Sequence, residues 1–318
     1  MSTKSKYIKK IISIDEKERI YKKYIPSVIF ERKANISGAC LHFYSDSEEW
    51  EDQWDENWFF IDEGIRSHAK LLSIESGSAA KGIPTVQYDP KSRTAFFKNN
   101  NYYGWLKSVA LALIGDVLED NHNIFSAHAA LLNLNGNGTC ILGPSGTGKT
   151  TLSYGLLTKQ NTKIVADDWF YFKFINGTIM GYRSEKNTYI RADLSQSWKE
   201  YKDIMRFAKM DNKGRAIINL SKVVGKEKIA DSIDITKFII LRREPNKPVV
   251  TKLTSKEALK HLVSHDFFNP HWLQKNSWKT EVRKNAYEKL LQKCDIIFLN
   301  TIETPKESLE RILDFTMK

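Results

Sequence analysis

Runs of apolar residues in the middle of the chain predict two strands and a helix. Phe125–Leu134 is a strand-like run, and Asn135–Gly138 directly after it is a strong hairpin turn. Thr139–Leu142 is a short apolar run that predicts the returning strand. Thr151–Leu157 has the pattern expected for the first turns of a helix. We therefore expect an α/β core in this region.

The same patterns continue toward the C-terminus. Short apolar runs predict strands at Lys163–Ala166, Phe238–Leu241 and Ile296–Leu299, and a hairpin made of Trp169–Ile175 and Thr178–Gly181. Helical periodicity predicts helices at about 255–264, 277–293 and 304–316. The three predicted helices therefore surround the last predicted strand.

The N-terminal part reads as a separate α+β region. Trp50, Trp54 and Trp58 are spaced four apart, which places three indoles on one helical face. A short helix docked on a core is one interpretation, and an aromatic surface for a partner is the other. A hairpin is expected at 85–97 and a buried helix at 105–118. We expect two domains, an N-terminal platform at 1–120 and a second domain at 121–318.

Composition narrows the class of protein. The chain has 318 residues, of which 41% are hydrophobic, which is enough for an ordinary core. No run of 18 apolar residues occurs, so we expect no membrane span. The N-terminus is basic without an apolar stretch, so a secretory signal is not expected. Cys40, Cys140 and Cys294 are far apart, which is typical of reduced thiols in a cytoplasmic protein.

The formal net charge of +11 admits two interpretations. A basic protein can bind nucleic acid, a phosphorylated ligand or an acidic peptide. Here the lysines are spread along the chain and no helix carries a dense arginine stripe, which favours a lysine-rich surface.

A phosphate-binding loop joins the predicted strand at Thr139–Leu142 to the helix that follows. The segment Gly143–Thr150 fits G-x-x-x-x-G-K-[ST], the Walker A pattern. In such a loop the backbone N–H groups converge on phosphate oxygens, and the helix N-terminus adds favourable partial charge. The residues expected to contact nucleotide are Gly143, Pro144, Ser145, Gly146, Thr147, Gly148, Lys149, Thr150 and Thr151.

The side chains of this loop suggest the cofactors. Lys149 would reach the β- and γ-phosphates, and the hydroxyl of Thr150 would hold Mg²⁺. ATP and Mg²⁺ are therefore the expected cofactors.

Asp167 and Asp168 end the next predicted strand, only 18 residues after Lys149. Two adjacent carboxylates can divide two tasks, because one can hold Mg²⁺ while the other accepts a proton from an attacking hydroxyl. Acidic pairs also end strands without any chemical role. Beside a phosphate loop we favour the chemical interpretation.

These motifs together resemble the HPr kinase/phosphorylase and phosphoenolpyruvate carboxykinase superfamily. The similar segments are G-P-S-G-T-G-K-T-T-L-S at 143–153, V-A-D-D at 165–168, and S-A-H-A-A at 126–130, where HPr kinases have a His-containing strand. A weaker similarity to the family's Arg-Gly-Leu-Gly-Ile-Ile-Asn-Val segment lies at 213–225, with Lys213 in place of its Arg and Arg215 shifted by two positions. The resemblance covers about residues 124–245, and the N-terminal third shows none.

The resemblance implies a P-loop kinase core built on a mixed β-sheet, and transfer of a γ-phosphoryl group to a serine hydroxyl. It implies that Asp167 is the general base and that Asp168 is a metal ligand together with Thr150, although the two aspartates could exchange roles. His128 would assist at the phosphate or at the nucleophile. The resemblance also implies a homo-oligomer.

Phosphoryl transfer is mostly positioning and charge stabilisation, so it needs cations besides Lys149. Lys213 and Arg215 are the candidates near the similar segment, and Arg183 and Arg191 precede it. A solvated surface position is an equally valid interpretation of each one alone.

Three classes of function stay open. The first is a kinase of a serine in a protein or peptide, which could be a precursor peptide. The second is a kinase of a small-molecule or RNA hydroxyl, and the third is a nucleotide-switched module that only hydrolyses ATP. A carboxykinase would require further metal ligands and arginines upstream of the loop, and residues 64–124 supply little of that kind.

Overall fold

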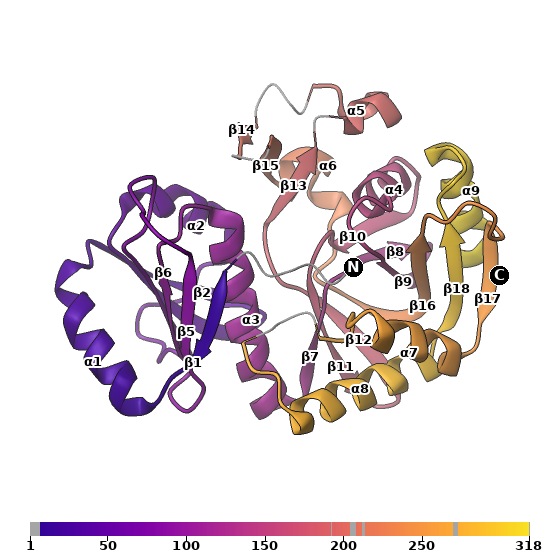
Figure 1. Ribbon diagram of the computed structural model, residues 1–318. Helices are drawn as coiled ribbons and strands as arrows, with labels where there is room; N and C mark the ends of the chain where they lie inside the picture. The colour runs from indigo at the N-terminus through magenta and orange to yellow at the C-terminus, as the bar shows by residue number, and fades with distance from the viewer. Residues whose placement is uncertain (1–6, 192, 204–207, 212–213, 270–272, 318) are drawn as a thin grey trace. The chain divides into compact units, whose positions relative to one another are not determined.

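The computed structural model describes residues 7–191, 193–203, 208–211, 214–269 and 273–317. The chain forms two compact units. One consists of Met1–Ile124 and Asn269–Thr280, and the other of Phe125–Phe268 and Glu281–Lys318. Figure 1 shows the elements of both units. Among the described residues, no helix combines the length and the apolar character needed to cross a membrane.

The first unit is built on a six-stranded mixed sheet with strand order β1-β5-β6-β4-β3-β2. Its strands are β1 (Ile8–Ile11), β2 (Phe30–Ile36), β3 (Ala39–Ser45), β4 (Ala69–Ile74), β5 (Thr85–Asp89) and β6 (Thr94–Lys98). Its helices are α1 (Ile14–Tyr24), α2 (Glu51–Asn57) and α3 (Tyr103–His122). The antiparallel pair of β5 and β6 confirms the hairpin expected at 85–97. The helix expected at 105–118 is the buried helix α3.

The three spaced tryptophans belong to the core of this unit. Trp50, Trp54 and Trp58 are each less than 5% exposed. The indole of Trp54 stacks on Phe43 of β3, with ring centroids 4.0 Å apart. The interpretation as an aromatic surface for a partner is therefore wrong, because burying these indoles against the sheet stabilises the fold.

The second unit is built on a nine-stranded mixed sheet. Seven strands follow the order β10-β8-β9-β16-β12-β11-β7, while β18 pairs with β16 and β17 pairs with β18. The strands are β7 (Ile124–Ala127), β8 (Ala130–Leu134), β9 (Asn137–Leu142), β10 (Thr162–Ala166), β11 (Phe170–Ile175), β12 (Thr178–Arg183), β16 (Ser232–Arg242), β17 (Val250–Leu253) and β18 (Asp295–Asn300). The mixture of parallel and antiparallel pairs confirms the mixed-sheet core expected from the sequence.

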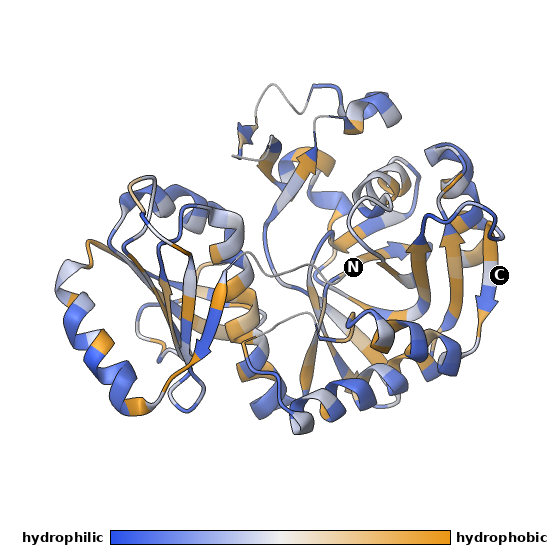
Figure 2. Cartoon of the chain, viewed as in Figure 1, coloured by the Kyte–Doolittle hydropathy of each residue, from blue (hydrophilic) through white to orange (hydrophobic). Residues whose placement is uncertain are grey.

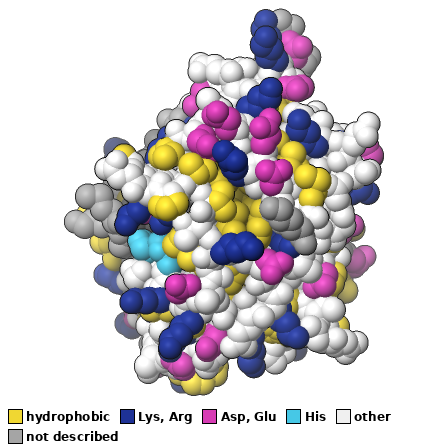
Figure 3. Space-filling model, turned by 90° about the vertical axis from the view of Figure 1, so that its right-hand side faces the viewer, with side chains coloured by type: hydrophobic (Ala, Val, Ile, Leu, Met, Phe, Trp, Pro, Cys, Tyr) yellow, Lys and Arg dark blue, Asp and Glu magenta, His cyan; other side chains and the backbone are white. Residues whose placement is uncertain are grey.

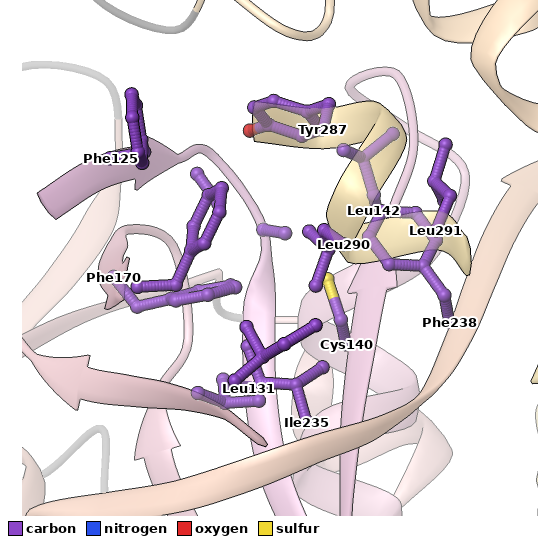
Figure 4. Packing of buried hydrophobic residues seen from close by; sticks show 14 of the residues in the cluster. Phe125, Leu131, Cys140, Leu142, Phe170, Ile235, Phe238, Tyr287, Leu290 and Leu291 are labelled. Atoms are coloured by element: carbon purple, nitrogen blue, oxygen red, sulfur yellow. The ribbon is translucent and has the colours of Figure 1, made fainter. Parts of the chain in front are cut away.

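Two hydrophobic layers cover the faces of this sheet. Alternate residues of a strand point to opposite faces, so Cys140 and Leu142 of β9 pack with α7 (Ser255–Ser264) and α8 (Ser277–Gln292). Ile141, between them, packs with α4 (Lys149–Leu157) and α9 (Pro305–Thr316). Figure 4 shows the first of these layers. Figure 2 shows β16 and β18 apolar along most of their length, as strands covered on both faces must be.

One expected strand is two strands in the structure. The run Phe125–Leu134 breaks at His128 and Ala129, because β7 pairs beside β11 whereas β8 lies between β9 and β10. The chain must leave the sheet to pass between these positions. His128 therefore lies in a connection and not on a strand, which corrects the sequence-based placement.

A small three-stranded sheet completes the second unit. It has the order β13-β15-β14, with β13 at Asn187–Arg191, β14 at Lys209–Met210 and β15 at Arg215–Asn219. The short helices α5 (Leu194–Ser197) and α6 (Leu220–Val224) flank it along the chain.

Candidate active site

The phosphate loop follows β9 and leads into α4, as the sequence predicts. Gly143 is confined by β16, since a Cβ atom there would lie 2.8 Å from Cβ of Leu241. Gly146 and Gly148 have φ values of 88° and 94°, which side chains other than glycine rarely adopt. The loop thus needs glycine at these places for two different reasons, close approach and backbone conformation.

Lys149 is the first residue of α4 and folds back over the loop. Its Nζ donates a hydrogen bond of 2.6 Å to the carbonyl oxygen of Gly143. Burial lowers the pKa of Lys149, and the negative charge of Asp168 acts in the opposite direction. The ammonium group is therefore partly desolvated, close enough to Asp168 to be affected by its charge, and set at the start of the helix.

Residues from another strand support the loop. The hydroxyl of Thr301, directly after β18, donates to the carbonyl oxygen of Thr147 at 3.0 Å. The hydroxyl of Thr147 donates to the carbonyl oxygen of Pro144 at 2.8 Å. On the helical side, Nε1 of Trp198 donates to the carbonyl oxygen of Thr151 at 2.7 Å. Thr301 is not among the residues predicted from the sequence, although it closely follows a predicted strand, and the carboxyl ends of parallel strands are common places for ligand-binding residues.

Asp167 is the buried member of the aspartate pair. It follows β10 and is 7% exposed. Its Oδ2 accepts a hydrogen bond from the hydroxyl of Thr188 on β13. That hydroxyl in turn accepts a 2.6 Å hydrogen bond from the phenol of Tyr154 on α4. The carboxylate is thus linked to the helix that carries the phosphate loop.

Asp168 is the exposed member of the pair. Its Oδ1 lies 2.9 Å from Nε2 of His128, and the two side chains are 44% and 53% exposed. The His128 ring stacks on Trp169, with centroids 5.8 Å apart. The sequence-predicted residues His128, Asp168 and Lys149 therefore come together from three separate segments of the chain.

The candidate cations have other contacts. Arg215 forms a 2.8 Å ion pair with Asp211, and its guanidinium lies 5.0 Å from the centre of the Tyr189 ring. Burial lowers the pKa of Arg215. Nε of Arg183 donates to the carbonyl oxygen of Glu185 at 3.0 Å.

The other two candidate cations are Arg191 and Lys213. Arg191 is exposed at the end of β13, opposite Arg215 in the register of the small sheet. Lys213 lies outside the described residues.

A second cluster of carboxylates lies in the first unit and has a different character. Oxygens of Asp116, Glu119 and Asp120 lie within 4.8 Å of one another. Nζ of Lys279 lies among them, 2.8 Å from Asp116 and 3.1 Å from Glu119. The lysine supplies the positive charge that a metal ion would otherwise bring, so this cluster is a salt-bridge network in which Asp116 and Glu119 are buried.

Residues 139–238, which include the phosphate loop and the aspartate pair, match the family model described as RNA helicase. A solved structure of the Hpr(Ser) kinase/phosphatase from Coxiella burnetii is similar at 17% sequence identity, over 60% of this chain and 97% of that chain, with a TM-score of 0.33. No curated protein matches.

The matched family model covers less than half of the chain. It includes the phosphate loop, in agreement with a nucleotide-binding P-loop core. That core is established by the loop and by the strand order of the second unit.

Proposed function

We propose that this protein is an ATP-dependent kinase that transfers the γ-phosphoryl group to a hydroxyl, namely a serine hydroxyl of a protein or peptide. The observation that carries the proposal is the exposed pair of Asp168 and His128. The negative charge of Asp168 acts on the ammonium group of Lys149 in the phosphate loop. A general base has to meet its acceptor hydroxyl at hydrogen-bond distance. This pair is open to an incoming hydroxyl and lies next to the expected place of the phosphates.

The surroundings of the two aspartates favour one division of roles. Asp168 is exposed and can meet an acceptor, so we assign it as the general base, positioned by His128. Asp167 is buried and anchored by Thr188, so we assign it to the metal side. This assignment exchanges the roles that the sequence resemblance implied first.

The proposed reaction moves one proton and exchanges one bond. The acceptor oxygen attacks the γ-phosphorus of ATP and forms a new P–O bond. The bond from the γ-phosphorus to the β,γ-bridging oxygen breaks, and ADP leaves with that oxygen. The hydroxyl proton passes to the carboxylate of Asp168.

The oxygen donors beside the loop fit Mg²⁺. The hydroxyl of Thr150 and the carboxylate of Asp167 are hard oxygen ligands of the kind that Mg²⁺ prefers. When bound with ATP, Mg²⁺ would neutralise charge on the β- and γ-phosphates. Lys149 would contribute to the same neutralisation from the start of α4. Lys213 and Arg215 are proposed to add positive charge near the transferred group.

The exposure of the base supports a polypeptide acceptor. A kinase of small molecules encloses its substrate in a concave pocket. Here the side chains of Asp168 and His128 are about half exposed. A serine on the surface of a partner or on an extended peptide could reach them without a closed pocket.

The match to the RNA helicase family model favours a second candidate, an ATPase that acts on RNA. The net charge of +11 agrees with it. On the face of the molecule seen in Figure 3, however, basic side chains are interspersed with acidic ones. Such a surface offers no continuous basic band for a phosphate backbone.

Transfer of label from γ-³²P-ATP tests the proposal. The protein is incubated with labelled ATP, Mg²⁺ and a library of serine-containing peptides, and in parallel with RNA and with small alcohols. We expect label on polypeptide, lost in Asp168→Asn and in peptides with alanine in place of serine. Asp314→Asn, an exposed aspartate on α9, is the matched control and should keep full transfer.

Label found only on RNA or on a small molecule would overturn the polypeptide acceptor. Free phosphate as the sole product, stimulated by RNA, would support the ATPase instead.

A further inference from the structure

A buried line of hydroxyl groups joins the phosphate-loop helix to the aspartate pair. It runs from the phenol of Tyr154 to the hydroxyl of Thr188 at 2.6 Å, and from there to the carboxylate of Asp167. Tyr154 and Thr188 are both 0% exposed. Polar groups so deeply buried are costly unless they are hydrogen-bonded, and here they bond to one another.

The direction of the hydrogen bonds is set by chemistry. Burial, together with the negative charge of Asp167, raises the pKa of Tyr154, so its phenol keeps its proton and can donate. Thr188 has one hydroxyl proton, which it donates to Asp167 while accepting from Tyr154. The line therefore ends on a carboxylate oxygen of Asp167.

Tyr154 and Thr188 are both held in place by residues outside this line. The phenol of Tyr201 donates to the carbonyl oxygen of Tyr154 at 2.8 Å, and the two rings meet edge to face. Thr188 pairs with Ile218 in the register of β13 and β15, which fixes its position along the strand. The line is therefore a rigid connection, well suited to hold one carboxylate oxygen in place.

The helix gives this line a link to the metal side of the site. Thr150 and Tyr154 are four residues apart on α4, so they lie on the same helical face one turn apart. The same helix thus carries the proposed metal-binding hydroxyl of Thr150 and, through Tyr154 and Thr188, fixes Asp167.

We infer that Thr188 and Tyr154 are positioning residues, which hold Asp167 so that it and Thr150 face the same Mg²⁺ of the bound nucleotide. This inference rests on the proposed function, because it takes Asp167 as the metal-side aspartate. It assigns a role in metal affinity to two residues that contact neither nucleotide nor acceptor. Losing such an outer contact typically lowers metal affinity about 10–100-fold.

The test measures nucleotide binding rather than turnover. Affinity for a fluorescent ATP analogue is determined with Mg²⁺ and with EDTA, and the ratio of the two affinities is the Mg²⁺-dependent gain. We expect Thr188→Val to reduce this gain roughly tenfold while affinity in EDTA stays unchanged. Tyr154→Phe should reduce it less, and Thr188→Ser should restore it because the hydroxyl returns.

A matched control separates positioning from general loss of stability. Thr162 is also buried in the second unit, and its hydroxyl donates to the carbonyl oxygens of Leu156 and Lys159 instead of to a carboxylate. Thr162→Val should lower the melting temperature yet keep the full Mg²⁺-dependent gain. Should Thr188→Val fail to fold, Tyr154→Phe carries the test, since it removes one hydroxyl and no ring packing.

The inference is overturned if folded Thr188→Val, or in its place Tyr154→Phe, keeps the wild-type gain, or if Thr162→Val loses the gain equally. Failure of the proposed function gives a different pattern. Absence of transfer to any acceptor, with the gain still dependent on Thr188, would remove the kinase assignment and leave the metal-positioning role.

Discussion

Two groups of carboxylates in this protein each have a lysine nearby, and the two lysines bond to different kinds of group. In the first unit Lys279 lies among Asp116, Glu119 and Asp120 and pairs with them at close range. In the second unit Lys149 bonds to a backbone carbonyl of the phosphate loop and meets Asp168 only through longer-range charge. In the first arrangement the protein's own cations neutralise the carboxylates, whereas in the second we expect the lysine to meet a bound nucleotide.

The comparison shows that proximity of acidic residues alone does not indicate a metal site. What matters is whether the fold already supplies the compensating charge. In the first unit Asp116 and Asp120 each pair with Arg93 as well as with Lys279. In the second unit the hydroxyl of Thr188 donates to Asp167, and the imidazole of His128 bonds to Asp168.

Among changes to the two lysines and to His128, the largest effect on transfer is expected from removing the lysine of the phosphate loop. Lys149→Ala should lower the rate of phosphoryl transfer by about 10²–10³-fold, because a charge aimed at the transferred group is lost. Its melting temperature should stay close to that of the wild type. Steady-state kinetics and a thermal melt on the same preparation measure both quantities. A much lower melting temperature with unchanged kinetics would show that Lys149 acts on stability and not on transfer.

Removing the other lysine should act on stability instead. Lys279→Met leaves the buried carboxylates of Asp116 and Glu119 without their central cation, which costs roughly 3–5 kcal/mol of unfolding free energy. ATP affinity of the folded variant should match the wild type. Denaturant unfolding and nucleotide titration test this, and the contrast would fail if the variant lost nucleotide affinity while keeping its stability.

A smaller effect is expected at the imidazole that meets Asp168. His128→Gln keeps a hydrogen-bond donor but loses the ring that stacks on Trp169, so transfer should fall roughly tenfold. ATP affinity should not change. A change in affinity without a change in rate would place His128 on the nucleotide side instead.

The smallest effects are opposite pH dependences of stability. The three carboxylates outweigh burial and raise the pKa of Lys279, so its stabilisation is present below pH 10.5 and is lost as pH rises through the raised value. Burial lowers the pKa of Lys149, so its charge destabilises the fold at neutral pH, and this penalty fades as pH rises toward 10.5.

Unfolding curves between pH 8 and about 12 for the wild type, Lys279→Met and Lys149→Met measure these slopes. The stability gap between wild type and Lys279→Met should shrink with rising pH. Any stability advantage of Lys149→Met should also shrink. Parallel curves for all three proteins would show that neither lysine has a shifted pKa.

Local signals in the sequence were sufficient for most of the second unit. The turn at Asn176-Gly177 has positive φ at both residues, as its composition indicates. The helices α7 and α9 begin at capping boxes, Thr254 with Glu257 and Thr304 with Glu307, and lie where periodicity placed them. Such features depend on neighbouring residues alone.

Long-range features could not be found in the same way. The break at His128 follows from where β7 and β8 pair in the sheet, which no local pattern encodes. Thr188 lies 21 residues from Asp167 and Lys279 lies 163 residues from Asp116, so their partnership depends on the fold. The loop and the aspartates were therefore predictable, whereas the side chains that position or neutralise carboxylates were not.

The most direct test of the account compares the two adjacent aspartates. Single-turnover transfer to a labelled peptide and Mg²⁺-dependent ATP affinity are measured for Asp167→Asn and Asp168→Asn. We predict that Asp168→Asn keeps its affinity and loses transfer by about 10²–10⁴-fold, whereas Asp167→Asn loses the Mg²⁺-dependent gain in affinity. Normal transfer in Asp168→Asn, together with intact Mg²⁺-dependent affinity in Asp167→Asn, would contradict the account.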